Sequence, residues 1–375
     1  MDAPTDTQTT SPSRMRKQRF AVASPGADLR QRRKAAVRGV HIKDEVFRDV
    51  LEKFKFQLNA IEDKEAEAFG LVIRGVSGVG KSHTMKHLIE CGDPRLAAYS
   101  DEFGDVRPVV YVRAPAPCDL TTLGIELYFK LTGKRLPPRG RPAEIWSRVR
   151  PALYNTGVCV IFIDEMHHVF LGKTHDQREN LMSTLKGLLQ GVDDEELAAL
   201  LGPLPPTVDP YPIGLVMAGL PSLKRLIALD DQLRMRCRFK AFAPLRTTAR
   251  DQAKLKAFIE FYAKGIGFTP VPKWTDPDML LRLTKASGGY RGRIALLIKQ
   301  AAMLAINRGL TSIGDWKPLF AECFEDIWET GSAKNPFLVP DVTKIGPIRE
   351  LQKDFDTLLR GKGAANLVND EDFDV

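Results

Sequence analysis

The sequence predicts an α/β fold in which helices flank a parallel sheet, followed by a domain made only of helices. Short apolar runs rich in β-branched residues alternate with amphipathic segments up to about residue 245. Each run is apolar throughout, which is typical of parallel strands covered on both faces. Beyond residue 245, apolar residues recur at helical spacing in every segment.

The elements follow one another at regular intervals along the chain. The predicted strands are residues 69–75, 107–115, 158–165 and 213–219. Helices are predicted at residues 43–67, 81–90, 120–133, 143–154 and 177–190, and then at 251–264, 276–286, 291–307 and 313–330. The expected domains are a disordered, basic arm (1–40), an α/β nucleotide-binding domain (41–245), a helical lid (246–332) and a tail with an acidic end (333–375). Residues 192–212, acidic and then proline-rich, are expected to form a surface insertion.

Composition narrows the class of protein. The chain has 375 residues, a net charge of +8 and 43% hydrophobic residues. The basic balance favours an anionic partner such as nucleic acid. Five scattered cysteines form no Cys-x-x-Cys pair, which disfavours both a zinc ribbon and a disulfide scaffold. No apolar run approaches the roughly 20 residues that span a bilayer. We therefore expect a cytoplasmic protein with no membrane partner.

A glycine-rich loop follows the first strand. The segment "GVSGVGKS" fits G-x-x-x-x-G-K-[ST], and a helix is predicted to begin in it. Such a loop points consecutive N–H groups at phosphate oxygens, and the helix adds the positive end of its dipole. The motif predicts ATP and Mg²⁺ as cofactors, with Lys81 on the β- and γ-phosphates and Ser82 on the metal. The expected nucleotide-binding residues are Gly75, Val76, Ser77, Gly78, Val79, Gly80, Lys81, Ser82 and His83.

Two carboxylates end the third strand, in "VCVIFIDE". We interpret Asp164 as the second metal-binding residue and Glu165 as the base that polarises the attacking water. The alternative is a purely structural role, with Asp164 as a helix N-cap and Glu165 as a first-turn carboxylate. A second alternative is a superfamily-2 helicase, because Asp164 to His167 spells that family's Asp-Glu-x-His box. That class needs a second strand-and-helix lobe, and here the chain becomes helical instead.

Three arginines follow the fourth strand, in "DDQLRMRCRF". Ring and filament ATPases project an arginine from this region toward the γ-phosphate of a neighbouring subunit. We expect Arg238, or else Arg236, to be this catalytic residue, with a basic helix face that contacts solvent or DNA as the alternative. Arg291 and then Arg293, at the start of a helix in "SGGYRGRIALL", are candidates for sensing the nucleotide.

Two further features concern the phosphate end of the site. The segment "VMAGLP" offers no polar side chain at the end of the fourth strand, so hydrolysis is expected to be slow. His167 and His168 are adjacent, and on a regular helix their side chains point about 100° apart. We therefore expect that the two cannot share a metal ion and that His167 lies near the phosphate or at a subunit contact.

With these motifs in place, the chain resembles the TnsC/TniB family of AAA+ transposition regulators. The resemblance covers about residues 40 to 310. It rests on "GVSGVGKS", "VVYVRAPAP", "IFIDEMHH" followed by "QRENLMSTLKGLLQ", "VMAGLPSLKRLI" and "QLRMRCRF". The segment "AGLP" departs from the Gly-Thr pair usual in the family.

The resemblance implies an AAA+ P-loop ATPase, of bacterial origin, that assembles into rings or helical filaments on double-stranded DNA. It would recruit a DDE transposase (TnsB/TniA-like) and a TniQ-like targeting protein, and ATP hydrolysis would drive disassembly. Charge suggests DNA contacts at Lys130, Lys134, Arg135, Arg139 and Arg141. Two alternatives stay open: a helicase loader or initiator of the same fold, and a nucleotide-gated adaptor that hardly hydrolyses ATP.

Overall fold

The computed structural model describes residues 27–63, 68–102, 104–170, 174–191, 212–246, 248–329 and 331–346. The chain divides into two compact units. The α/β unit contains residues 43–252 and 287–294, and the helical unit contains residues up to 42, 253–286 and 295–345. Among the described residues, no helix is long and apolar enough to cross a membrane.

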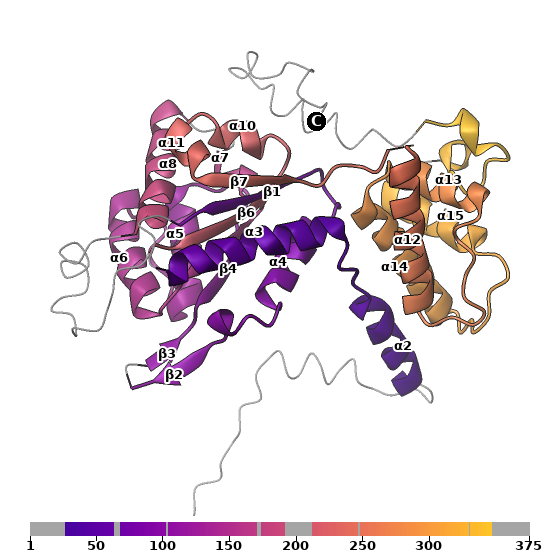
Figure 1. The fold of residues 1–375 in the computed structure, drawn as a ribbon, viewed down its shortest axis with the longest axis horizontal. Coiled ribbons are helices and arrows are strands. Elements are labelled where there is room, and N and C mark those ends of the chain that lie inside the picture. Colours follow the sequence, from indigo (N-terminus) through magenta and orange to yellow (C-terminus); the bar gives the residue numbers. More distant parts are fainter. Residues whose placement is uncertain are drawn as a thin grey trace, which may run out of the picture. The chain divides into compact units, whose positions relative to one another are not determined.

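The α/β unit is built on a five-stranded sheet in the order β4-β5-β6-β1-β7 (Figure 1). The strands are β1 (Gly70–Arg74), β4 (Val109–Arg113), β5 (Val160–Asp164), β6 (Gly214–Gly219) and β7 (Cys237–Ala241). All neighbouring strands pair in parallel. Their carboxyl ends therefore meet at one edge of the sheet, where ligands of open α/β sheets bind.

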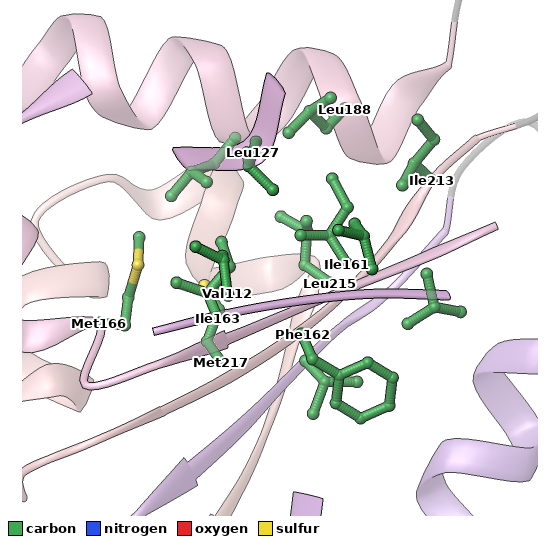
Figure 2. Close-up of a cluster of buried hydrophobic side chains, with 14 of the residues drawn as sticks. Val112, Leu127, Ile161, Phe162, Ile163, Met166, Leu188, Ile213, Leu215 and Met217 are labelled. Carbon is green, nitrogen blue, oxygen red and sulfur yellow. The ribbon is translucent and has the colours of Figure 1, made fainter. Parts of the chain in front are cut away.

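Helices cover the sheet on both faces, as the apolar strands predict. They are α3 (Glu45–Glu62), α4 (Lys81–Ile89), α5 (Leu120–Thr132), α6 (Pro142–Asn155), α7 (His167–Phe170), α8 (His175–Gln190), α10 (Leu223–Ile227) and α11 (Asp231–Met235). Ile161 lies with Leu127 of α5 and Leu188 of α8 in one buried cluster, whereas Phe162 points to the opposite side of β5 (Figure 2). There its ring meets Phe54 of α3 edge-on at 5.5 Å.

The helical unit contains α2 (Ala27–Gly39), α13 (Pro277–Ser287), α15 (Lys317–Trp328), and most of α12 (Ala249–Gly265) and α14 (Arg291–Asn307). Its core includes a chain of aromatic rings: Trp316 contacts Trp274 edge-on at 4.9 Å, and Phe320 stacks on Phe337 at 5.2 Å. Phe337 follows the short helix η2 (Ser332–Lys334) and precedes η3 (Val342–Lys344). The first part of the predicted tail is therefore packed into this core.

Several elements differ from the sequence predictions. Residues 27–39 form α2, with Val37 fully buried, where a disordered arm was expected. Strand β7 was not predicted, because as an edge strand it carries charged residues and lacks a continuous apolar run. The hairpin of β2 (Tyr99–Asp101) and β3 (Gly104–Val106), preceded by η1 (Pro94–Leu96), was also missed. The expected insertion at residues 192–211 and the acidic C-terminal end lie outside the described residues, as do residues 1–26.

Candidate nucleotide-binding site

The glycine-rich loop leaves the carboxyl end of β1 and enters α4. Gly78 and Gly80 have φ angles of 77° and 103°, in the region that favours glycine. Gly80 is also the N-cap of α4, so the first N–H groups of that helix face the loop. A Cβ atom built on Gly80 meets nothing within 4 Å, which leaves the loop open at this residue. This is the geometry of an anion-binding helix terminus.

Lys81 is buried inside this loop, with 6% of its surface exposed. Its Nζ donates to the carbonyl oxygens of Gly75 at 2.8 Å and Val76 at 2.9 Å. Burial lowers the pKa of Lys81 and nearby Arg293 adds to this, while Glu165 and Asp164 oppose it. The ammonium is thus held by two neutral acceptors, and a phosphate oxygen would be a stronger partner for it.

Asp164 ends β5 with 2% of its surface exposed. Its Oδ2 accepts a hydrogen bond from the Tyr111 hydroxyl at 2.8 Å, and its Oδ1 accepts one from the Glu165 N–H at 2.9 Å. Burial and the Asp164 carboxylate raise the pKa of Tyr111, so its phenol stays a donor. The sequence prediction did not include Tyr111. Strand register could have found it, because Arg113 pairs with Asp164 and Tyr111 lies on the same face of β4.

Glu165 has a φ angle of 54°, which is uncommon for a residue with a side chain. Its carboxylate lies 3.7 Å from Nη2 of Arg113 and 3.5 Å from Nδ1 of His167. Left-handed backbone at a non-glycine residue costs energy and is concentrated at functional sites. The turn directs Glu165 out of the strand line, between a cation on the neighbouring strand and a buried ring.

His167 occupies the space beside the end of β6. A Cβ atom added to Gly219 would lie 3.4 Å from Nδ1 of His167, and His167 is 3% exposed. Burial lowers the pKa of His167 to about 3, with further contributions from His168 and Lys81. The ring is therefore neutral, and it lies where the fourth predicted strand offers no polar side chain.

The expectation that the two histidines diverge is wrong. Their ring centroids are 4.2 Å apart, and one ligand atom from each of Glu165, His167 and His168 lies within 4.8 Å of the others. The expectation assumed a regular helix, whereas α7 is a single turn that begins at His167. Because the two rings do not diverge, the predicted divergence gives no ground for excluding a shared ion.

The start of α14 lies directly against the glycine-rich loop. A Cβ atom on Gly292 would be 2.3 Å from the carbonyl carbon of Val79, so only glycine permits this approach. Nε of Arg293 donates to the carbonyl oxygen of Ser77 at 3.4 Å. Arg291, which sequence favoured, instead pairs with Asp44 at 3.2 Å. The structure thus brings Arg293, rather than Arg291, to the loop.

Comparison with protein families identifies the part of the chain that carries these motifs. Residues 35–193 match the model of the family described as "Bacterial TniB protein". Over this region, the chain is similar to the TniB family. The predicted resemblance is confirmed there, and the match includes the glycine-rich loop, Asp164 and Glu165. No curated protein is similar enough to count as a match.

Solved structures support the fold over most of the chain. Cdc6p from Pyrobaculum aerophilum has a TM-score of 0.51 and 14% identity, over 80% of this chain and 72% of that chain. The Aeropyrum pernix ORC1 protein, solved in complex with DNA, has a TM-score of 0.50 and 16% identity, over 75% and 65%. At these identities the similarity shows the fold alone, which is that of AAA+ ATPases, as predicted.

Two predicted arginines lie beyond the TniB match, at the opposite end of the sheet from the loop. Arg238 pairs in register with Leu71, near the start of β1. Its guanidinium lies 4.6 Å from the centroid of the Phe69 ring and donates to the carbonyl oxygen of Met235 at 3.2 Å. Arg236 forms the C-cap of α11 and donates to the carbonyl oxygen of Gln232 at 3.3 Å. Neither side chain is directed toward the loop of its own subunit.

The basic residues proposed from charge lie within the TniB region, on the end of α5 and in the segment that leads to α6. All five are exposed: Lys130, Lys134, Arg135, Arg139 and Arg141. Arg135 pairs with Glu126 at 3.1 Å and lies 4.4 Å from the centroid of the Phe129 ring. Exposure and sign of charge suit these residues for phosphate contacts.

Proposed function

We propose that this protein is an ATP-dependent regulator of DNA transposition that binds duplex DNA with little sequence preference and assembles on it. The observation that carries the proposal is the TniB match over the same residues that place a buried lysine and a buried carboxylate at one edge of the sheet. The net charge of +8 supports an anionic partner.

In this proposal the site holds Mg–ATP. The open loop and its buried lysine fit a triphosphate, with the N–H groups of Gly78 to Ser82 around the phosphates. Ser82 and Asp164 would hold Mg²⁺, which neutralises developing charge when it is bound. Tyr111 fixes the orientation of Asp164 by its 2.8 Å hydrogen bond. Glu165 would polarise the attacking water.

Arg238 would act on the nucleotide of a neighbouring copy. From Leu71, its partner in the sheet, β1 runs four residues to Gly75, which at about 3.3 Å per residue is about 13 Å. That distance exceeds the reach of an arginine side chain toward its own loop. The Arg238 side chain is exposed, so it could enter a site on another subunit, as a ring or helical filament requires.

The assembled form would recruit a DDE transposase (TnsB/TniA-like) and a TniQ-like targeting protein, and hydrolysis would take the assembly apart. Two other functions are supported by specific observations. The similarity to Cdc6p and ORC1 supports an initiator or helicase loader. The small residues Ala218 and Gly219 at the end of β6 support a weakly hydrolysing adaptor.

The first test compares duplex DNA affinity with ATP and with ADP at two salt concentrations. We expect tighter binding with ATP and a steep loss of affinity at higher salt, because Lys and Arg release counterions from phosphates. Substituting Lys134 and Arg139 together with Gln should weaken binding to all duplex sequences by a similar factor. Equal affinity with ATP and ADP would contradict nucleotide-dependent assembly.

The second test uses Glu165→Gln, which keeps the shape of the side chain and removes the base. We expect hydrolysis to fall about 10²-fold or more while ATP binding persists. Assemblies on DNA should then outlive those of the unmodified protein. If the variant keeps both the ATPase rate and the assembly lifetime, hydrolysis is not the disassembly step. Stable loading of a replicative helicase, with no effect on a transposase, would favour the initiator function.

A further inference from the structure

Helix α4 carries two histidines one turn apart, on the surface of the α/β unit. His83 and His87 have the i, i+4 spacing that places side chains on one helix face. Their Nε2 atoms lie 3.2 Å apart, and the ring planes are at 84° with centroids 4.4 Å apart. His83 is the last of the residues predicted to bind the nucleotide, but the proposed nucleotide chemistry assigns no role to either imidazole.

This separation matches a shared metal ion. A tetrahedral ion with metal–nitrogen distances of about 2.0–2.1 Å holds two nitrogen ligands about 3.4 Å apart. The Nε2 atoms of His83 and His87 are therefore already close to the spacing that chelation needs. The same 3.2 Å also suits an N–H···N hydrogen bond between two neutral rings, which is the simpler explanation to be tested.

Two neighbouring residues lie around the His87 ring in positions that suit a metal ligand. Its Nδ1 lies 3.7 Å from the Glu90 carboxylate, on the ring edge away from Nε2. A carboxylate behind the second nitrogen is the usual outer partner of a metal-binding histidine, because it fixes the tautomer and raises basicity. Phe47 meets the His87 ring edge-on at 6.5 Å and limits its rotation.

We propose that His83 and His87 form a chelating site for a divalent transition metal ion such as Ni²⁺, Zn²⁺ or Cu²⁺. Imidazole ligands select these ions over Mg²⁺, which prefers oxygen. The site is thus distinct from the magnesium position expected at Ser82 and Asp164. Because it joins two successive turns of α4, a bound ion would stabilise the helix that follows the glycine-rich loop.

The test is calorimetric titration of Ni²⁺ into the tag-free, nucleotide-free full chain. Nickel is chosen because it favours imidazole over the carboxylates elsewhere on the surface. We expect one equivalent to bind and His87→Gln to weaken that binding at least about tenfold, since one of two chelating nitrogens is lost. His83→Gln should have the same effect, and Glu90→Gln a smaller one.

The matched control is His175→Gln, which removes an exposed histidine beside Asp176 and Glu179 on α8. This control should titrate like the unmodified protein. Nickel should also raise the melting temperature of the unmodified chain and of His175→Gln, but not of His87→Gln. The proposal is overturned if no Ni²⁺ binds, if His87→Gln binds as tightly as the unmodified chain, or if His175→Gln loses the binding. None of these results depends on ATP or DNA.

Discussion

The two ends of the parallel sheet differ in whether their charged side chains are buried or exposed. At the carboxyl end, Lys81 and Asp164 are almost fully buried, at 6% and 2% exposed. At the amino end, Arg238 is exposed and its guanidinium lies over the Phe69 ring. Burying a charge is costly unless a partner compensates it, so the carboxyl end is prepared for a charged ligand. The amino end keeps its charge in water, available to another molecule.

The largest effect is expected for Arg238, and its absence would contradict the contrast between the two ends of the sheet. Arg238→Ala should lower the ATPase rate about 10³-fold, because the transition state loses a positive charge supplied from a neighbouring copy. Mixing this variant with Lys81→Ala should restore part of the activity, since each copy supplies what the other lacks. Arg234→Ala, in the same segment, serves as the control and should change the rate little. No recovery on mixing would contradict action between subunits.

The next effect concerns the close contact at the carboxyl end. Gly292→Ala places a methyl group within 2.6 Å of backbone atoms of Gly78 and Val79, which cannot move aside independently. We expect the free energy of unfolding of the α/β unit to fall by about 1–3 kcal/mol, measured by urea denaturation, with weaker ATP binding. Gly314→Ala, where a methyl group meets nothing within 4 Å, should change stability by less than about 0.5 kcal/mol.

The buried histidine gives a pH dependence with a definite sign. Since the pKa of His167 is about 3 in the folded protein and 6.5 ordinarily, the unfolded chain gains a proton first as pH falls. The neutral His167 ring therefore makes its full contribution to the free energy of unfolding above pH 6.5. That contribution is lost progressively toward pH 3, by about 2 kcal/mol at pH 5.

The check is the loss of unfolding free energy between pH 7 and pH 5. In His167→Gln that loss should be about 2 kcal/mol smaller than in the unmodified chain. The control His175→Gln removes a side chain that is 83% exposed and should leave the pH dependence unchanged. An unaltered slope in His167→Gln would show that this ring is not held neutral in the folded chain.

The smallest effect tests the support of Asp164. Tyr111→Phe removes one hydrogen bond to a carboxylate, which is worth about 1–2 kcal/mol. We expect the Mg²⁺ concentration for half-maximal ATPase to rise roughly five- to tenfold, with ATP binding in the absence of Mg²⁺ unaffected. Tyr99→Phe, on the exposed hairpin, should match the unmodified protein.

The sequence was most informative where the functional residues follow one another in the chain. The motif at Gly75 to Ser82 and the carboxylates after an apolar run indicate a strand, a loop and a helix without knowledge of distant contacts. Tyr111 and Gly292 could not be found in that way. Their roles come from strand register and from the approach of a helix more than 200 residues away in sequence, which local patterns do not encode.

The same limit explains the choice between two arginines. Arg291 and Arg293 flank Gly292 in sequence, and spacing alone does not distinguish them. The difference comes from Asp44. One of its carboxylate oxygens caps α3 and the other pairs with Arg291. Arg293 has no such partner at Asp44 and lies beside the loop. Strand β7 was missed for a similar reason, because an edge strand is defined by its neighbour rather than by its own apolar residues.

The sheet order also has a consequence for the length of the ligand. β6 lies between β1, which ends at the loop, and β5, which ends at Asp164. Hydrogen-bonded strands are about 4.8 Å apart, so these two ends are separated by about 10 Å. A single phosphate ion cannot span that width, whereas a polyphosphate chain with its cation can. The width of one intervening strand therefore selects long anions over short ones before any side chain contacts them.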